Sequence, residues 1–199
     1  MQVKLQEKEA EAEEREQRTA MLTIRQKDLF DPRMAFVTGP TNAKTTLVEF
    51  YDYDCPYCRA SQPAIRKYYE AHRNDTRFSF IEFPILSLHG PGAVLAARAS
   101  LAARRQPEKF TAFHFALMGE DSAITEEIIF ADAAKAGLDI ARLKADMQNP
   151  EIDQAIDLAH KLALRIKING TPAFVINGHL HMGAVGDDDL KSLTKEKPV

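Results

Sequence analysis

The pattern of apolar and polar positions separates an N-terminal segment from the rest of the chain near residue 31. Residues 1–29 contain no Gly, Pro or aromatic residue and mix Glu and Gln with Lys and Arg, which favours an exposed helix of about 40 Å. An interrupted apolar stripe on this helix comprises Val3, Ala10, Met21 and Ile24. The segment is therefore either a solvated helix or an oligomerisation helix whose best apolar seam is residues 20–30.

The pattern changes after residues 30–44, where two prolines and one glycine end the helix. The stretch TTLVEFYDY (45–53) is β-branched and aromatic and predicts a buried strand. CPYCRASQPAIRKYYEAHR (55–73) predicts a helix with Pro56 at its first position and a kink at Pro63. RFSFIEFPI (77–85) predicts a second strand, so the strand–helix–strand order indicates a parallel βαβ unit.

The remaining pattern is helical and then returns to strand. Residues from about Pro91 to Ile166 have helical patterns with stops at Gly137 and Pro150. In TPAFVINGHLHMGA (171–184), the dipeptide Asn177-Gly178 predicts a β-hairpin turn, and DDLKSLTKE predicts a closing helix. We therefore expect an α/β domain over residues 32–199 with a helical insertion at about 87–168, preceded by a helical extension over residues 1–31.

Composition excludes some partners. The chain has 199 residues, 45% of them hydrophobic, and a net charge of −3, which is enough for one core and gives no reason to expect nucleic acid or anionic lipid as a partner. No apolar run approaches the roughly 20 residues that span a bilayer. The first residues are too polar for a signal peptide, so we expect either a cytosolic protein or the mature form of an exported one.

Cys55 and Cys58 are the only two cysteines. A zinc site made of cysteine alone needs four thiolates and is excluded within one chain, whereas a mixed Cys/His site stays possible. A structural disulfide across two intervening residues would remove little unfolded-state entropy. Redox chemistry is therefore the leading interpretation of the pair.

The predicted positions of the two thiols suit that chemistry. Cys55 falls at a helix N-terminus, where unpaired amides and the helix dipole stabilise a thiolate and lower its pKa. Cys58, nearly one turn further on, is placed to attack a mixed disulfide on Cys55 and release the product.

Two further positions need an explanation. Glu49 lies in an apolar strand six residues before Cys55. It is either a buried acid that relays the proton Cys58 must lose, or an edge residue that faces water or pairs with a helix cation. Pro172 is either an ordinary proline at the start of an edge strand or part of a cis Thr171–Pro172 bond beside the thiols, where a substrate strand could pair.

With these elements in order, the chain resembles the DsbA-like branch of the thioredoxin superfamily, and within it the group of suppressor-of-copper-sensitivity C proteins. The matching features are LVEFYDYDCPYC, the helical insertion beginning with LHGPGAVLAARAS, and GTPAFVING. The resemblance implies a thioredoxin fold over roughly residues 32–199. It implies these roles: Cys55 as nucleophile, Cys58 as resolving thiol, Glu49 as buried acid, and Pro56, Tyr57, Thr171 and Pro172 as substrate-binding residues.

Three functions use the same pair of cysteines. A disulfide isomerase would rest reduced and attack wrong disulfides through Cys55, whereas a dithiol oxidase would rest as the Cys55–Cys58 disulfide and donate it. Tyr57 cannot supply the cation of a His at that position, and Thr precedes the proline as in isomerases, so the isomerase is favoured. A copper-binding redox protein or chaperone would clasp Cu(I) with the thiols, joined by His179 and His181. We expect no cofactor and no required metal.

The resemblance also implies partners and a location. The substrates would be misfolded or unfolded proteins that contain disulfides, and a membrane redox partner would reset the thiols. The chain would form a homo-oligomer, a trimer by resemblance, through residues 1–30. The mature protein would be periplasmic.

Overall fold

The computed structural model describes the backbone of residues 2–198. The side chains of residues 1–5, 7, 9, 10, 13, 14 and 18 lie outside the described residues, and with them the predicted stripe members Val3 and Ala10. No helix among residues 2–198 is both long enough and apolar enough to cross a bilayer.

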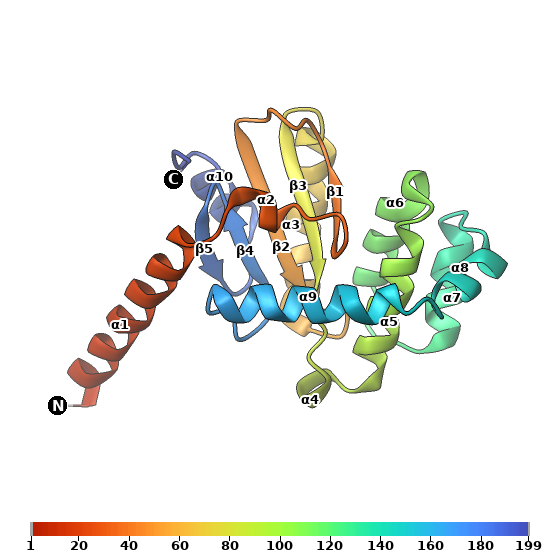
Figure 1. Cartoon of the computed structure of the whole chain (residues 1–199), viewed down its shortest axis with the longest axis horizontal. Coiled ribbons are helices and arrows are strands. Elements are labelled where there is room, and N and C mark those ends of the chain that lie inside the picture. The colour runs from red at the N-terminus through yellow and green to blue at the C-terminus, as the bar shows by residue number, and fades with distance from the viewer. Residues whose placement is uncertain (1, 199) are drawn as a thin grey trace.

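A five-stranded mixed sheet forms the centre of the molecule (Figure 1). Its order is β1-β3-β2-β4-β5, and the strands are β1 (Ala35–Thr38), β2 (Thr45–Tyr51), β3 (Thr76–Glu82), β4 (Ala173–Ile176) and β5 (His179–Met182). Strands β2 and β3 are parallel and joined by α3 (Pro56–His72), whereas the other neighbouring pairs are antiparallel. The predicted βαβ unit is therefore confirmed.

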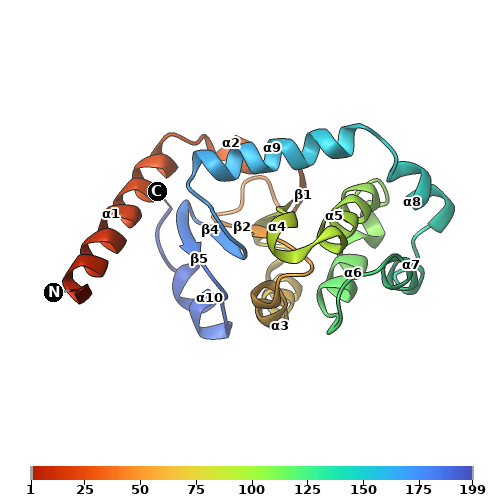
Figure 2. The same cartoon turned by 90° about the horizontal axis from the view of Figure 1, so that it is seen from below.

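Helices cover both faces of the sheet (Figure 2). Helix α9 (Glu151–Arg165) crosses one face, and α3 with α10 (Asp187–Leu193) covers the other. The core between these layers is strongly aromatic; Phe50, Phe78, Phe80 and Phe174 are at most 1% exposed.

Between β3 and β4 the chain forms the predicted run of helices. These are α4 (Leu86–His89), α5 (Pro91–Ala103), α6 (Pro107–Met118), α7 (Glu126–Lys135), α8 (Ile140–Asp146) and α9. N-cap residues begin two of these helices. The Thr125 hydroxyl accepts from the Ile128 amide at the start of α7, and the Asp139 carboxylate accepts from the Arg142 amide at the start of α8. Helices α5 to α8 lie together beside the sheet (Figure 2).

The predicted hairpin turn is also confirmed. Asn177 and Gly178 separate β4 from β5 and have φ angles of 51° and 89°. Both are in the left-handed region, which an Asn-Gly turn of this kind requires.

The N-terminal segment differs from the single helix expected over residues 1–29. Helix α1 (Gln2–Leu22) ends early, because the amides of Thr23 and Ile24 bond three residues back and tighten the last turn. A second helix, α2 (Gln26–Leu29), follows. Leu29 and Phe30 are about 5% exposed and belong to the core.

The segment 30–44 contains a strand that the sequence pattern did not indicate. β1 pairs antiparallel with β3, with Phe36 opposite Phe80. Four residues between prolines and a glycine are too short for a clear alternation of apolar and polar positions, so only the pairing with β3 defines this edge strand.

Candidate active site

The two thiols lie where the sequence places them, at the junction of β2 and α3. Cys55 is the N-cap residue of α3, with Pro56 at the first helical position. The turn before it closes through a 3.1 Å hydrogen bond from the Cys55 amide to the Asp52 carbonyl. Both cysteines are free thiols and at most 2% exposed, while Tyr57 between them is 66% exposed.

The surroundings of Cys55 favour its anion. A hydrogen bond from Cys58 is the largest influence that lowers the pKa of Cys55, to about 5. Burial opposes this effect, and hydrogen bonds from Thr171 and from the backbone amides of Cys58 and Tyr57 add to it. At neutral pH, Cys55 is therefore a thiolate.

Cys58 behaves in the opposite way. Burial raises the pKa of Cys58 far above that of an ordinary thiol, and its hydrogen bond to Cys55 and the negative charge there raise it further. Cys58 therefore keeps its proton and donates it to the Cys55 thiolate. To attack a mixed disulfide on Cys55, it must first pass this proton to a base.

Glu49 is the buried acid that the sequence suggested, and the alternative of an edge residue facing water is wrong. The residue is 3% exposed in central strand β2, between Phe80 of β3 and Phe174 of β4. Burial raises the pKa of its carboxyl group to about 8. Its Oε2 atom has no hydrogen-bond partner among the described residues, and a charge on Glu49 raises the pKa of Cys58.

The Thr171–Pro172 bond is cis, which confirms the second interpretation of this proline. The loop lies against the nucleophile, since Cys55 Sγ is 3.2 Å from the Thr171 carbonyl oxygen. Pro172 directly precedes β4, which pairs with β2. The structure therefore brings together β2, the start of α3 and the start of β4 around one thiolate.

Sequence reasoning missed the polar residues that hold the active-site turn. The Asp52 carboxylate accepts from the amides of Asp54 (2.9 Å) and Ile85 (2.8 Å) and lies 2.7 Å from His89 Nδ1. The Asp54 carboxylate accepts from Arg59 (3.0 Å) and from the Ile124 amide (2.9 Å). The sequence shows the two aspartates of DYDC, but their partners Ile85, His89 and Ile124 are distant in sequence.

Among the side chains that the structure describes, no group of three or more His, Cys, Asp or Glu residues is placed to hold a metal ion. His179, considered above as a copper ligand, lies 3.0 Å from the Lys197 carbonyl through its Nε2 atom. His181 is opposite Phe174 in the β4–β5 pair.

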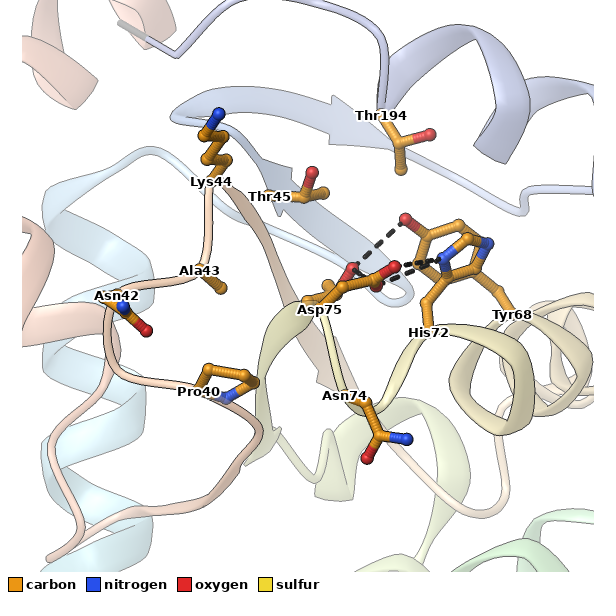
Figure 3. A pocket seen from close by; sticks show the side chains of 11 residues that line it. Pro40, Asn42, Ala43, Lys44, Thr45, Tyr68, His72, Asn74, Asp75 and Thr194 are labelled. Carbon is orange, nitrogen blue, oxygen red and sulfur yellow. Dashed lines mark hydrogen bonds and ion pairs between the residues drawn. The ribbon is translucent and has the colours of Figure 1, made fainter.

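A polar pocket lies at the opposite end of the sheet (Figure 3). It contains Thr45 and Thr76, the first residues of the parallel strands β2 and β3, with His72 stacked on Tyr68. Cys55 follows the other end of β2. This pocket is therefore separate from the thiols by the length of the strand.

Comparison with known proteins agrees with this arrangement. The family model for the DSBA-like thioredoxin domain matches residues 46–196. The curated proteins include a Na⁺/H⁺ antiporter of Salinispora tropica that is 30% identical over 166 residues, or 81% of the chain. The chain spans only about a quarter of the length of such relatives, 24% in this case.

Solved structures resemble the chain over most of its length. A thioredoxin-like oxidoreductase from Silicibacter pomeroyi is 38% identical, with a TM-score of 0.76 over 85% of this chain and 95% of that one. A periplasmic thioredoxin-like protein from Salmonella enterica serovar Typhimurium is 31% identical (TM-score 0.75; 87% and 97% covered). A linker-deleted, mutant form of Proteus mirabilis ScsC is 26% identical (TM-score 0.79; 97% and 87% covered).

Proposed function

The chain belongs to the family of DSBA-like thioredoxin domains, and from that premise we propose that it is a protein disulfide isomerase. Its broader activity is thiol-disulfide exchange on a thioredoxin-like fold. The observation that carries the proposal is the Cys55 thiolate, whose pKa is lowered to about 5, beside the cis Thr171–Pro172 loop.

The reaction begins when the Cys55 thiolate attacks one sulfur of a wrong disulfide in a misfolded protein. A new S–S bond forms to Cys55, the old S–S bond breaks, and the other client sulfur leaves as a thiolate. A different client thiolate then attacks the mixed disulfide, forms the new client disulfide and returns Cys55 as a thiolate. No net oxidation occurs in this cycle.

Cys58 supplies an escape route when the client does not resolve the intermediate. Its sulfur attacks Cys55, the client leaves reduced, and the Cys55–Cys58 disulfide remains. The proton that Cys58 loses goes to the ionised form of Glu49. The raised pKa makes this carboxylate a stronger base than an ordinary one, although it is the minority form at pH 7. A membrane redox partner would then return two electrons to the pair.

The alternative is a dithiol oxidase, which runs the Cys58 step in reverse and donates the disulfide to reduced clients. The same residues serve both directions, and the redox poise of the pair decides between them. The exposed Tyr57 and the Thr171 before Pro172 favour the isomerase. By likeness to the Salmonella protein, we place the mature chain in the periplasm.

Refolding of scrambled ribonuclease in a glutathione buffer tests the proposal. We expect the wild-type chain to restore ribonuclease activity, Cys55→Ser to abolish it, and Cys58→Ser to retain part of it while accumulating mixed disulfides. Oxidation of reduced ribonuclease by the same variants measures the alternative. Full isomerisation by Cys55→Ser would overturn the mechanism, and rapid oxidation without isomerisation would favour the oxidase.

A further inference from the structure

An ion pair lies directly beside the nucleophile and is not used in the exchange steps above. The Arg59 guanidinium donates from Nε to the Tyr53 carbonyl (2.8 Å) and from an Nη atom to the Asp54 carboxylate (3.0 Å). Both side chains are shielded, with 18% of Arg59 and 9% of Asp54 exposed.

Three contacts hold the Asp54–Arg59 ion pair in place. Arg59 belongs to the first turns of α3, and its amide donates to the Cys55 carbonyl. Asp54 Oδ1 also accepts from the Ile124 amide. A side chain at Gly92, at the start of α5, would come within 2.6 Å of Asp54 Oδ2, so the helical insertion packs directly onto this carboxylate.

Only a short stretch of backbone separates the ion pair from the nucleophile. Arg59 contacts Tyr53 and Asp54, which are two residues and one residue before Cys55, and two residues of chain span at most about 7 Å. Partly buried charges at this range are poorly screened by salt. In the intact pair the two charges oppose each other, and the groups that mainly lower the pKa of Cys55 are Cys58, Thr171 and nearby amides.

We propose that Asp54 and Arg59 are positioning residues that set the redox poise of the Cys55–Cys58 pair, with Asp54 cancelling a cation that would otherwise make the protein a stronger oxidant. The inference rests on the redox function proposed above. It adds two residues that would set how strongly the Cys55–Cys58 disulfide oxidises a client.

The relevant equilibrium is reduction of the disulfide by glutathione. The Cys55–Cys58 disulfide and two glutathione thiols give the Cys55 thiolate, the Cys58 thiol, oxidised glutathione and one proton. Two electrons pass to the protein, and a negative charge appears on Cys55. A free cation near Cys55 therefore favours the reduced form, and a free anion favours the disulfide.

Single substitutions of the two partners should move this equilibrium in opposite directions. Asp54→Asn keeps an oxygen that accepts from Ile124 and Arg59 but removes the negative charge. It should shift the equilibrium about threefold to tenfold toward the reduced form, where tenfold corresponds to about 30 mV, and lower the pKa of Cys55. Arg59→Gln should shift both quantities the other way by a similar factor.

The two directions separate an electrostatic role from a structural one. If the pair only supported the fold, both variants would lose stability and shift the equilibrium in the same direction or not at all. The double variant Asp54→Asn/Arg59→Gln should return close to wild type, and Arg59→Lys, which keeps the charge, should stay close to it. Arg66→Gln is the matched control, because Arg66 lies further along α3 in a largely exposed pair with Glu70.

The measurement is the fraction of reduced protein across a series of glutathione ratios, followed by alkylation and mass spectrometry, with thiolate absorbance at 240 nm giving the pKa of Cys55. Opposite shifts support the inference. Shifts of the same sign, or none, in variants that unfold cooperatively would overturn it. Failure of the wild-type chain to exchange with glutathione at all would instead overturn the proposed function.

Discussion

Glu49 is a buried carboxyl group whose Oε2 atom has no hydrogen-bond partner among the described residues. With its pKa raised to about 8 by burial, it is protonated in the folded protein at pH values at which the unfolded chain has already ionised. The unfolded chain releases its proton near the ordinary pKa of 4.5. The contribution of the protonated Glu49 to the free energy of unfolding is therefore fully present below pH 4.5 and is lost as the pH rises toward 8.

Glu49→Gln removes this titration. We expect the variant to be more stable than wild type by about 3 kcal/mol at pH 7, with the difference vanishing near pH 4. Release of a mixed disulfide by Cys58 should become slower, because Gln accepts no proton. Urea unfolding of the reduced protein at several pH values measures the first effect. The exposed Glu70→Gln is the control, and a stability difference independent of pH would contradict the expectation.

The sequence could identify Glu49 and the two thiols because their roles follow from spacing along one strand and one helix. Asp54 and Arg59 could not be found in this way. Their position depends on Ile124 and Gly92, which folding brings from the helical insertion to the active-site turn. Local pattern contains no information about such contacts.

Helix α3 is joined to the segment before α10 by a single buried hydroxyl. Ser61 is fully buried; its Oγ accepts from the Val185 amide at 3.0 Å and donates to the Tyr57 carbonyl at 3.1 Å. The bond connects the helix that presents the thiols to the chain that follows β5. It therefore fixes the orientation of one element relative to another.

Ser61→Ala should leave the Val185 amide buried without a partner. We expect a loss of about 1–3 kcal/mol in the free energy of unfolding, measured by urea denaturation. Ser192→Ala on α10 is the control, since that residue is exposed, and it should change stability little. An equal effect of the two substitutions would show that the buried bond contributes nothing specific.

At the level of elements, segments with a clear period or a turn signal were predictable, and segments with neither were not. The strands around Glu49 and Phe80, helix α3 and the Asn177-Gly178 hairpin follow from pattern and turn chemistry. Strand β1 depends on pairing with β3. After the early end of α1, Leu29 and Phe30 pack into the core, where Ser79 donates to the Leu29 carbonyl.

In the whole molecule, α1 projects away from the domain and lies beside β5 (Figure 1). Met21 and Ile24, part of the seam expected to bind a partner copy, instead pack against the protein's own core. Leu22 is 69% exposed. Of the stripe members whose side chains are described, Met21 lies in α1 and Ile24 in the bend after it, and helical periodicity could not show which surface covers them.

An oligomer through the extension would therefore use the exposed Leu22 together with the part of α1 before Ala20. Deleting residues 1–19 tests this, because Met21, Ile24 and the buried Leu29 and Phe30 remain in place. We expect the full chain to form a multimer, the deleted chain to be a monomer of unchanged stability, and isomerisation to fall while dithiol oxidation persists. Sedimentation velocity gives the oligomeric state. A monomer in both samples would show that isomerisation does not depend on an oligomer. The chemistry at Cys55 alone would then have to account for any isomerase activity.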